Sequence, residues 1–222
     1  IICVAQSEKE EICKFYDISP SKVVVAGQYV HPSFIYAAHD AYGFPRKSGI
    51  HYKIEPVYFP NMSYHNSEMC DWWSYKAFTY TGRMSLNKGI KYIIQAWYIL
   101  YEKYENLCPP LWLVGGNAYD IEQLRPQLGI SIEKLCHLEE TNKLVWWGYL
   151  DENGISALYT RTLALVTHSL YEPGGRVAVE AMCSGIPVLA TPNGFALDSI
   201  RDWNNGFLIP YGDVNTLAIR LE

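Results

Sequence analysis

The 222-residue sequence lacks several features that would place it in common classes of protein. Its six cysteines are scattered without a CxxC pair, which excludes a zinc ribbon and a small disulfide scaffold. No apolar run approaches the roughly 20 residues that a membrane-spanning helix needs. The formal net charge of -5 argues against a general nucleic-acid-binding protein, because such a protein needs a basic face for the phosphate backbone. We therefore predict a soluble globular protein of a reducing, cytoplasmic compartment that does not bind nucleic acid in general.

Spacings typical of metal ligands are missing as well. Five of the six histidines show no such spacing, and no DxD-like acidic pair stands in a suitable turn. The sixth, His168, closes a predicted strand, where a structural role is favoured over a place in a binding site. We expect no obligatory metal.

What the sequence does contain, from Ala77 onward, is a regular alternation of short apolar runs and longer stretches with helical spacing. The runs are nearly continuous in apolar character, as strands covered on both faces must be. The predicted strands are residues 77–82, 111–116, 143–148, 163–168, 187–191 and 206–210, and the predicted helices are residues 88–104, 120–128, 151–160, 175–184 and 213 to the end. This order predicts an α/β fold with a doubly wound parallel sheet.

The chain divides into three parts by pattern. Residues 1–36 read as a strand, a helix from Glu8 to Tyr16 with Ser7 as its N-cap, and a second strand. Residues 37–76 lose the pattern and are predicted to be an irregular insertion or loop, and residues 77–222 form the main domain. Because the sequence opens on an apolar strand without an initiator Met and ends inside a helical pattern, we expect it to be an excerpt.

Ligands of open α/β sheets bind outside the carboxyl ends of the strands, and two turns there carry suggestive residues. The first, "GRMSLNKGI", sets Arg83 at a strand end and Lys88 near the start of a helix. Two cations at a helix N-terminus are unfavourable unless an anion lies there, so a diphosphate would explain them. A solvated lysine and an arginine paired with a surface carboxylate is the alternative.

The second turn, "SLYEPGGRVAVEAMCSGIPV", places Glu172 ahead of a predicted helix and Glu180 inside it. Arg176, Glu180 and Ser184 share one stripe of that helix, but Arg ahead of Glu is the poorer order, and an Arg in the first turn opposes the helix dipole. We therefore do not expect an ion pair between Arg176 and Glu180. A ligand with a central anion and hydroxyls at both ends, such as a nucleotide-sugar, would fit the two glutamates.

The segments "YTGRMSLNKGI", "LVGG", "VWWGYL", "LYEPGGRVAVEAMCSGIPVLAT" and "NNGFLI" together resemble the C-terminal half of a GT-B glycosyltransferase, most closely the retaining family 4 (glycosyl transferases group 1). The resemblance covers nearly all of residues 77–221 and implies a Rossmann-like domain that binds the nucleotide-sugar donor. It implies that Arg83 and Lys88 bind the diphosphate and stabilise the departing nucleotide, that Glu172 contacts the transferred sugar, and that Glu180 binds the ribose. The other donor-binding residues that it implies are Gly82, Gly148, Tyr149, Leu150, Gly174, Gly175 and Arg176.

The resemblance also extends to residues 1–36, which are similar to the end of the N-terminal acceptor domain and its linker. It departs at Gly174, where an aromatic residue is common, and at Arg176, where an aliphatic one is common. Arg176 would then add a third phosphate contact. The predicted partners are the donor and a missing acceptor domain, with peripheral contact at the inner membrane face left open. A nucleotide-sugar epimerase and a non-catalytic nucleotide-sugar-binding scaffold remain the alternative functions.

Overall fold

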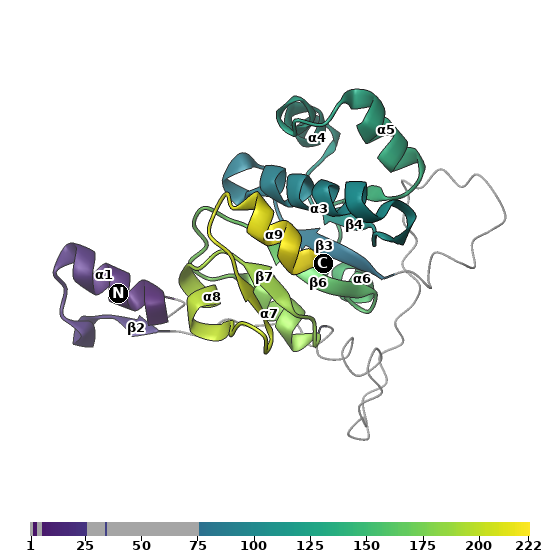
Figure 1. The fold of residues 1–222 in the computed structure, drawn as a ribbon. Coiled ribbons are helices and arrows are strands. Elements are labelled where there is room, and N and C mark those ends of the chain that lie inside the picture. Colours follow the sequence, from purple (N-terminus) through teal and green to yellow (C-terminus); the bar gives the residue numbers. More distant parts are fainter. Residues whose placement is uncertain (1, 4–5, 26–33, 35–75) are drawn as a thin grey trace, which may run out of the picture.

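The computed structural model describes residues 2–3, 6–25, 34 and 76–222 (Figure 1). Apart from its last residue, the predicted insertion at residues 37–76 therefore lies outside the described residues.

A parallel sheet of six strands forms the centre of the main domain (Figure 1). Its strands are β3 (Ala77–Thr81), β4 (Leu111–Val114), β5 (Leu144–Gly148), β6 (Thr162–Thr167), β7 (Val188–Ala190) and β8 (Gly206–Leu208). They lie in the order β5-β4-β3-β6-β7-β8, and every neighbouring pair is parallel. All six predicted strands are confirmed. The winding direction reverses between β3 and β6, which is where a doubly wound sheet opens a crevice for a ligand.

Helices cover both faces of the sheet, as the predicted fold class requires. One face packs against α3 (Ile90–Tyr104) and α9 (Val214–Leu221), with α4 (Ala118–Leu124) and α5 (Ile132–Glu140) alongside. The other face packs against α6 (Glu152–Tyr159), α7 (Arg176–Cys183) and α8 (Gly194–Ser199). The sequence did not predict α5 or α8. The helix predicted at residues 120–128 is α4 followed by a short 3-10 turn at Arg125–Gln127.

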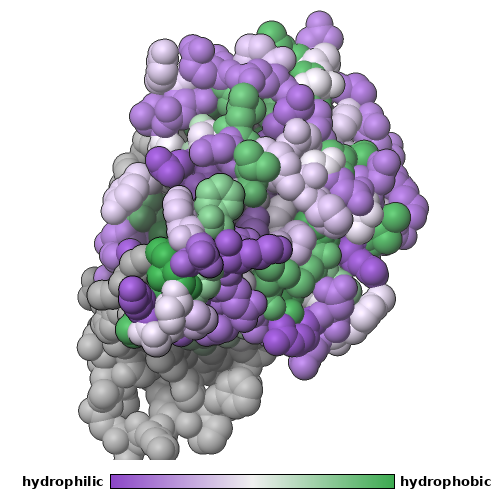
Figure 2. All heavy atoms as spheres, turned by 90° about the vertical axis from the view of Figure 1, so that its left-hand side faces the viewer, coloured by the Kyte–Doolittle hydropathy of each residue, from purple (hydrophilic) through white to green (hydrophobic). Residues whose placement is uncertain are grey.

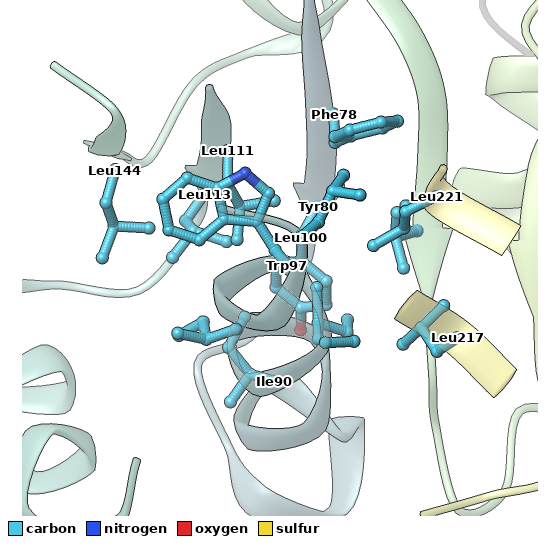
Figure 3. Close-up of a cluster of buried hydrophobic side chains, with 14 of the residues drawn as sticks. Phe78, Tyr80, Ile90, Trp97, Leu100, Leu111, Leu113, Leu144, Leu217 and Leu221 are labelled. Atoms are coloured by element: carbon cyan, nitrogen blue, oxygen red, sulfur yellow. The ribbon is translucent and has the colours of Figure 1, made fainter. Parts of the chain in front are cut away.

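The largest core cluster lies between the sheet and α3 (Figure 3). Trp97 of α3 is fully buried, and its indole N–H donates to the carbonyl of Pro109 at 2.9 Å. Leucines from the strands surround the indole on one side, while Leu217 and Leu221 of α9 approach from the other. This packing fixes α3, and with it the loop that joins α3 to β3.

A smaller N-terminal unit consists of β1 (Ile2–Cys3), α1 (Gln6–Tyr16), a 3-10 turn (Pro20–Lys22) and β2 (Val24–Val25), with β1 and β2 parallel. The prediction that Ser7 caps this helix is wrong, because α1 already begins at Gln6. Asp198 of α8 instead accepts the backbone N–H groups of Gln6 at 2.6 Å and Ser7 at 3.1 Å. A carboxylate at a helix N-terminus is favoured by the helix dipole. The first turn of α1 is therefore anchored on α8.

The side of the molecule that carries the N-terminal unit has a mixed surface (Figure 2). Hydrophilic side chains dominate the visible face, and hydrophobic ones are interspersed among them. Within the described ranges, no helix combines the length and apolar character that crossing a bilayer requires.

Candidate functional site

The loops that follow β3 and β6 lie against each other at the reversal point of the sheet. The backbone N–H of Leu170 donates to the carbonyl of Asn87 at 2.9 Å. Gly89 approaches the second loop so closely that a Cβ there would stand 1.9 Å from the carbonyl oxygen of His168. The two loops singled out from the sequence therefore form one continuous surface at the carboxyl edge of the sheet.

An ion pair between Lys88 and Glu172 joins the two loops. The side chains are 20% and 27% exposed, so the pair is reachable from solvent. Glu172 also accepts the backbone N–H of Gly175 at 3.2 Å. Lys88 ends a 3-10 turn, and α3 begins two residues later at Ile90, so the lysine stands just ahead of the helix N-terminus. The structure thus brings together Lys88, Glu172 and the start of α7.

Arg83 is exposed on the loop after β3 and forms no ion pair with another described residue. Its carbonyl accepts the hydroxyl of the buried Tyr80 at 2.6 Å, which fixes the backbone of the loop. Burial raises the pKa of Tyr80 above its ordinary value, and the charge of Glu172 adds to the rise. Tyr80 therefore stays a neutral hydrogen-bond donor, and the Arg83 side chain is left available to an anion.

Helix α7 begins at Arg176, with Gly175 as its N-cap in the left-handed conformation at φ 58°. The predicted start near Gly175 is therefore confirmed. Gly174 is buried in the loop just before it. A glycine is needed at the cap because other residues adopt a positive φ only with strain.

The expectation that Arg176 and Glu180 would not pair is wrong. Arg176 Nε lies 2.8 Å from Glu180 Oε1, and Arg176 Nη2 lies 3.4 Å from Glu152 Oε1. The preference for charge order, on which the expectation rested, is a small effect that was established for isolated helices. Glu180 is buried, however, and a buried carboxylate requires a charged or hydrogen-bonded partner.

The remaining candidates lie along the same edge of the sheet. Gly82 follows β3, and its N–H donates to Val114 at 2.9 Å, while Gly148 ends β5 and accepts the N–H of Gly115 at 2.6 Å. Tyr149 is 83% exposed and Leu150 is half-buried. These residues therefore line the half of the edge on the β5 side of Arg83.

Asn193, which the sequence did not single out, fixes the loop that carries Glu172. Its side-chain oxygen accepts the N–H of Glu172 at 3.0 Å, and its side-chain nitrogen donates to Ser169 O at 3.1 Å and Thr191 Oγ1 at 2.9 Å. An Asn-Gly pair ordinarily indicates a turn, so no local pattern indicated this long-range role. The cavity beneath the loop measures about 10 Å³, room for one water at most, so this cavity is too small for a nucleotide.

His168 has the structural role that the sequence favoured. It is buried, its Nε2 accepts the N–H of Gly212 at 2.8 Å, and its ring stacks on Tyr211. Burial lowers the pKa of His168 from 6.5 to about 4, with Asp213 partly opposing the shift.

We expect His168 to make folding stability depend on pH. The unfolded chain takes up this proton near pH 6.5, but the folded chain resists it down to about pH 4. The neutral His168 side chain therefore makes its full contribution to the free energy of unfolding above pH 6.5. This contribution is lost as the pH falls to 4, and the loss is at most about 3 kcal/mol. Urea denaturation at pH 7, 5 and 4 should show a flatter profile for His168→Gln, whose amide oxygen can still accept a hydrogen bond. The exposed His137→Gln is the control, and equal slopes for both variants would refute the assignment.

Comparison with known proteins bears on this arrangement. The sequence profile of the family described as Glycosyl transferases group 1 matches residues 74–222, about two thirds of the chain. The chain belongs to this family. An uncharacterized glycosyltransferase of Methanocaldococcus jannaschii is 28% identical over 214 residues, which cover 94% of this chain and 46% of that protein. A mannosylfructose-phosphate synthase of Agrobacterium fabrum is 33% identical over 113 residues, which cover 51% of this chain and 24% of that protein.

Solved structures of glycosyltransferases share the fold. A glycosyltransferase from Rickettsia africae matches with a TM-score of 0.68 at 19% identity, covering 99% of this chain and 51% of that one. The Anabaena protein HepE, solved in complex with UDP-glucose, matches with a TM-score of 0.64 at 21% identity, covering 99% of this chain and 52% of that one. This chain of the group 1 family thus spans about half the length of these proteins.

Proposed function

We propose that this chain carries the donor-binding domain of a retaining glycosyltransferase of family 4, which transfers a hexosyl unit from a nucleotide-diphosphate sugar to an acceptor and releases the nucleoside diphosphate. The observation that carries the proposal is the meeting of Lys88, Glu172 and the start of α7 at the reversal point of the sheet, with Arg83 exposed on the same loop as Lys88. The UDP-glucose complex of HepE, a protein of the same fold, supports the donor class.

In the proposed complex, the diphosphate lies between Arg83 and Lys88, close to the N-termini of α3 and α7. Exposed cations and unpaired helix amides are what a diphosphate requires. Lys88 exchanges its bond to Glu172 for a phosphate oxygen, which frees the Glu172 carboxylate to accept a hydroxyl of the sugar. Glu180, about one and a half turns into α7, accepts the ribose hydroxyls, and the base lies toward Gly148, Tyr149 and Leu150.

The chemistry in this proposal depends on stabilising the leaving group. As the bond between the anomeric carbon and the phosphate oxygen breaks, negative charge collects on the departing diphosphate. Positive groups placed in advance at that position are usually the largest single catalytic term. Arg83 and Lys88 supply this charge, so the proposal requires no metal or other cofactor. No group of three or more His, Cys, Asp or Glu that could hold a metal occurs among the residues described.

The N-terminal unit supports a second part of the proposal, that residues 1–36 belong to an acceptor domain. Its two-stranded sheet is too small to be stable alone, and Phe15 and Val24 are 83% and 59% exposed. Further strands of an acceptor domain would cover them. Cys13, Cys108, Cys136 and Cys183 are unpaired, which supports a cytoplasmic enzyme, with peripheral membrane contact still open.

Calorimetric titration with UDP, GDP and ADP tests the proposal. The chain should bind one of them, and Arg83→Ala should weaken that binding about 10- to 100-fold, since hydrogen bonds to charged groups are lost. Glu180→Ala should weaken it as well. The matching nucleoside without phosphates is the control and should bind wild type and Arg83→Ala alike. If neither variant weakened the tightest ligand, the site assignment would fail.

A transfer assay separates the enzyme from the two alternative functions. Release of nucleoside diphosphate that depends on an acceptor identifies a transferase. Conversion of the donor without an acceptor indicates an epimerase, and binding without turnover indicates a scaffold. We expect the 222 residues alone to bind donor weakly and to transfer little.

A further inference from the structure

Glu180 is a buried carboxylate whose charge partner lies at the protein surface. Its side chain is 4% exposed, whereas that of Arg176, one turn earlier on α7, is 60% exposed. Arg176 uses Nε for Glu180 and Nη2 for Glu152 of α6. The guanidinium is thus held between carboxylates of two helices. A role as a third phosphate contact is poorly compatible with this position, because both of these nitrogens already have partners.

The groups around Glu180 make Arg176 important for its charge. Burial raises the pKa of Glu180, and Glu152 raises it further. Among the described groups, only Arg176 lowers the pKa of Glu180, through a hydrogen bond and through its opposite charge. Glu180 in turn raises the pKa of Tyr159 on α6 and of Cys183 on α7, after the larger effect of burial on each. Among the described residues, no second cation lowers the pKa of Glu180 if Arg176 is replaced.

We propose that Arg176 is a positioning residue that keeps Glu180 ionised and fixes one of its oxygens, so that the other can accept a ribose hydroxyl of the donor. This inference rests on the proposed function for the role of Glu180, but not for its ionisation. It explains why a cation stands in the first turn of α7, where the helix dipole disfavours one. A bond to an ionised carboxylate is about twice as strong as one to a neutral group, so the charge matters for binding.

The ionisation claim is tested without any ligand by 13C NMR titration of the Glu180 carboxyl. Arg176→Leu should raise its pKa above the wild-type value, and Arg176→Lys should restore part of the difference. Glu152→Gln is the matched control, because it removes a negative charge next to Glu180 where Arg176→Leu removes a positive one. It should leave the pKa of Glu180 at or below that of wild type. An unchanged pKa in Arg176→Leu would overturn the inference.

The binding claim is tested with whichever of UDP, GDP and ADP binds most tightly and with its 2′,3′-dideoxy counterpart. The ratio of the two affinities reports the contribution of the ribose hydroxyls and cancels the titration of the phosphates. In wild type we expect this ratio to be the same at pH 8 and pH 6, and in Arg176→Leu to fall about fivefold at pH 6. A ratio that does not change with pH in Arg176→Leu overturns the role in binding. If no diphosphate binds wild type while the NMR shift is present, the proposed function fails and the ionisation role stands.

Discussion

Replacing Lys88 by methionine should lower kcat for sugar transfer about 10²- to 10³-fold in the full-length enzyme that the proposed function requires. Lys88 lies one residue before the N-cap of α3, and its ammonium group forms an ion pair with Glu172 of the other loop. In the transition state it would instead meet the charge that collects on the departing diphosphate. Methionine keeps an unbranched side chain that is only one atom shorter, and it removes the charge. Release of nucleoside diphosphate from the nucleotide-sugar, measured at saturating donor, checks this result.

Lys91→Met is the matched control, because it makes the same change in the first turn of α3 at a residue with no role in the proposed site. It should transfer sugar at nearly the wild-type rate. If Lys88→Met retained wild-type kcat, Lys88 would only hold the loops together through Glu172. In that case the unfolding free energy would change and catalysis would not.

Replacing Gly194 by alanine should both destabilise the chain and abolish donor binding. Gly194 has φ 49°, and a Cβ there would stand 2.1 Å from the carbonyl oxygen of Glu172 and 2.6 Å from that of Pro173. Neither backbone atom can move without displacing the loop that presents the Glu172 carboxylate. We expect a loss of about 3 to 5 kcal/mol in unfolding free energy. Urea denaturation and calorimetry with a nucleoside diphosphate measure the two effects.

Gly129→Ala separates backbone strain from the clash. Gly129 also has a positive φ, 73°, but the nearest atom to a Cβ there is the side-chain nitrogen of Gln95 at 3.4 Å, an ordinary van der Waals contact. Its cost should be about 1 to 2 kcal/mol, the strain of a left-handed conformation alone, with unchanged ligand binding. Equal effects of the two variants on binding would show that the contact between Gly194 and the Glu172 loop is unimportant.

The alternation of elements in the main domain could be predicted because its strands are buried on both faces. The predicted strands at residues 77–82 and 111–116 are β3 and β4, in which every residue is buried. Helix α5 gave a weak signal, because only Leu135 and Leu138 of its nine residues are buried. Helix α8 has six residues, too few for a periodic pattern, and its first residue is the glycine of a turn-like Pro-Asn-Gly.

The contacts that the sequence did not predict depend on tertiary packing. The cap of α1 comes from Asp198, 192 residues from Gln6, so the local rule chose Ser7 instead. Asn193 reaches Glu172 across 21 residues. The Arg176–Glu180 pair was misjudged because burial of Glu180 outweighs the small preference for charge order on an isolated helix. Local sequence patterns singled out Arg83, Lys88, Glu172 and Glu180 as candidates, but they did not predict the contacts of Lys88, Glu172 and Glu180 within the fold.

The central claim is that one surface, at the reversal point between β3 and β6, holds a nucleotide-sugar donor. A crystal structure of the chain with the tightest-binding nucleoside diphosphate tests it most directly. We predict that the diphosphate contacts Arg83 and Lys88, that Lys88 leaves Glu172, and that the ribose hydroxyls bond to Glu180. A nucleotide bound at another edge of the sheet, with the Lys88–Glu172 pair intact, would contradict the account.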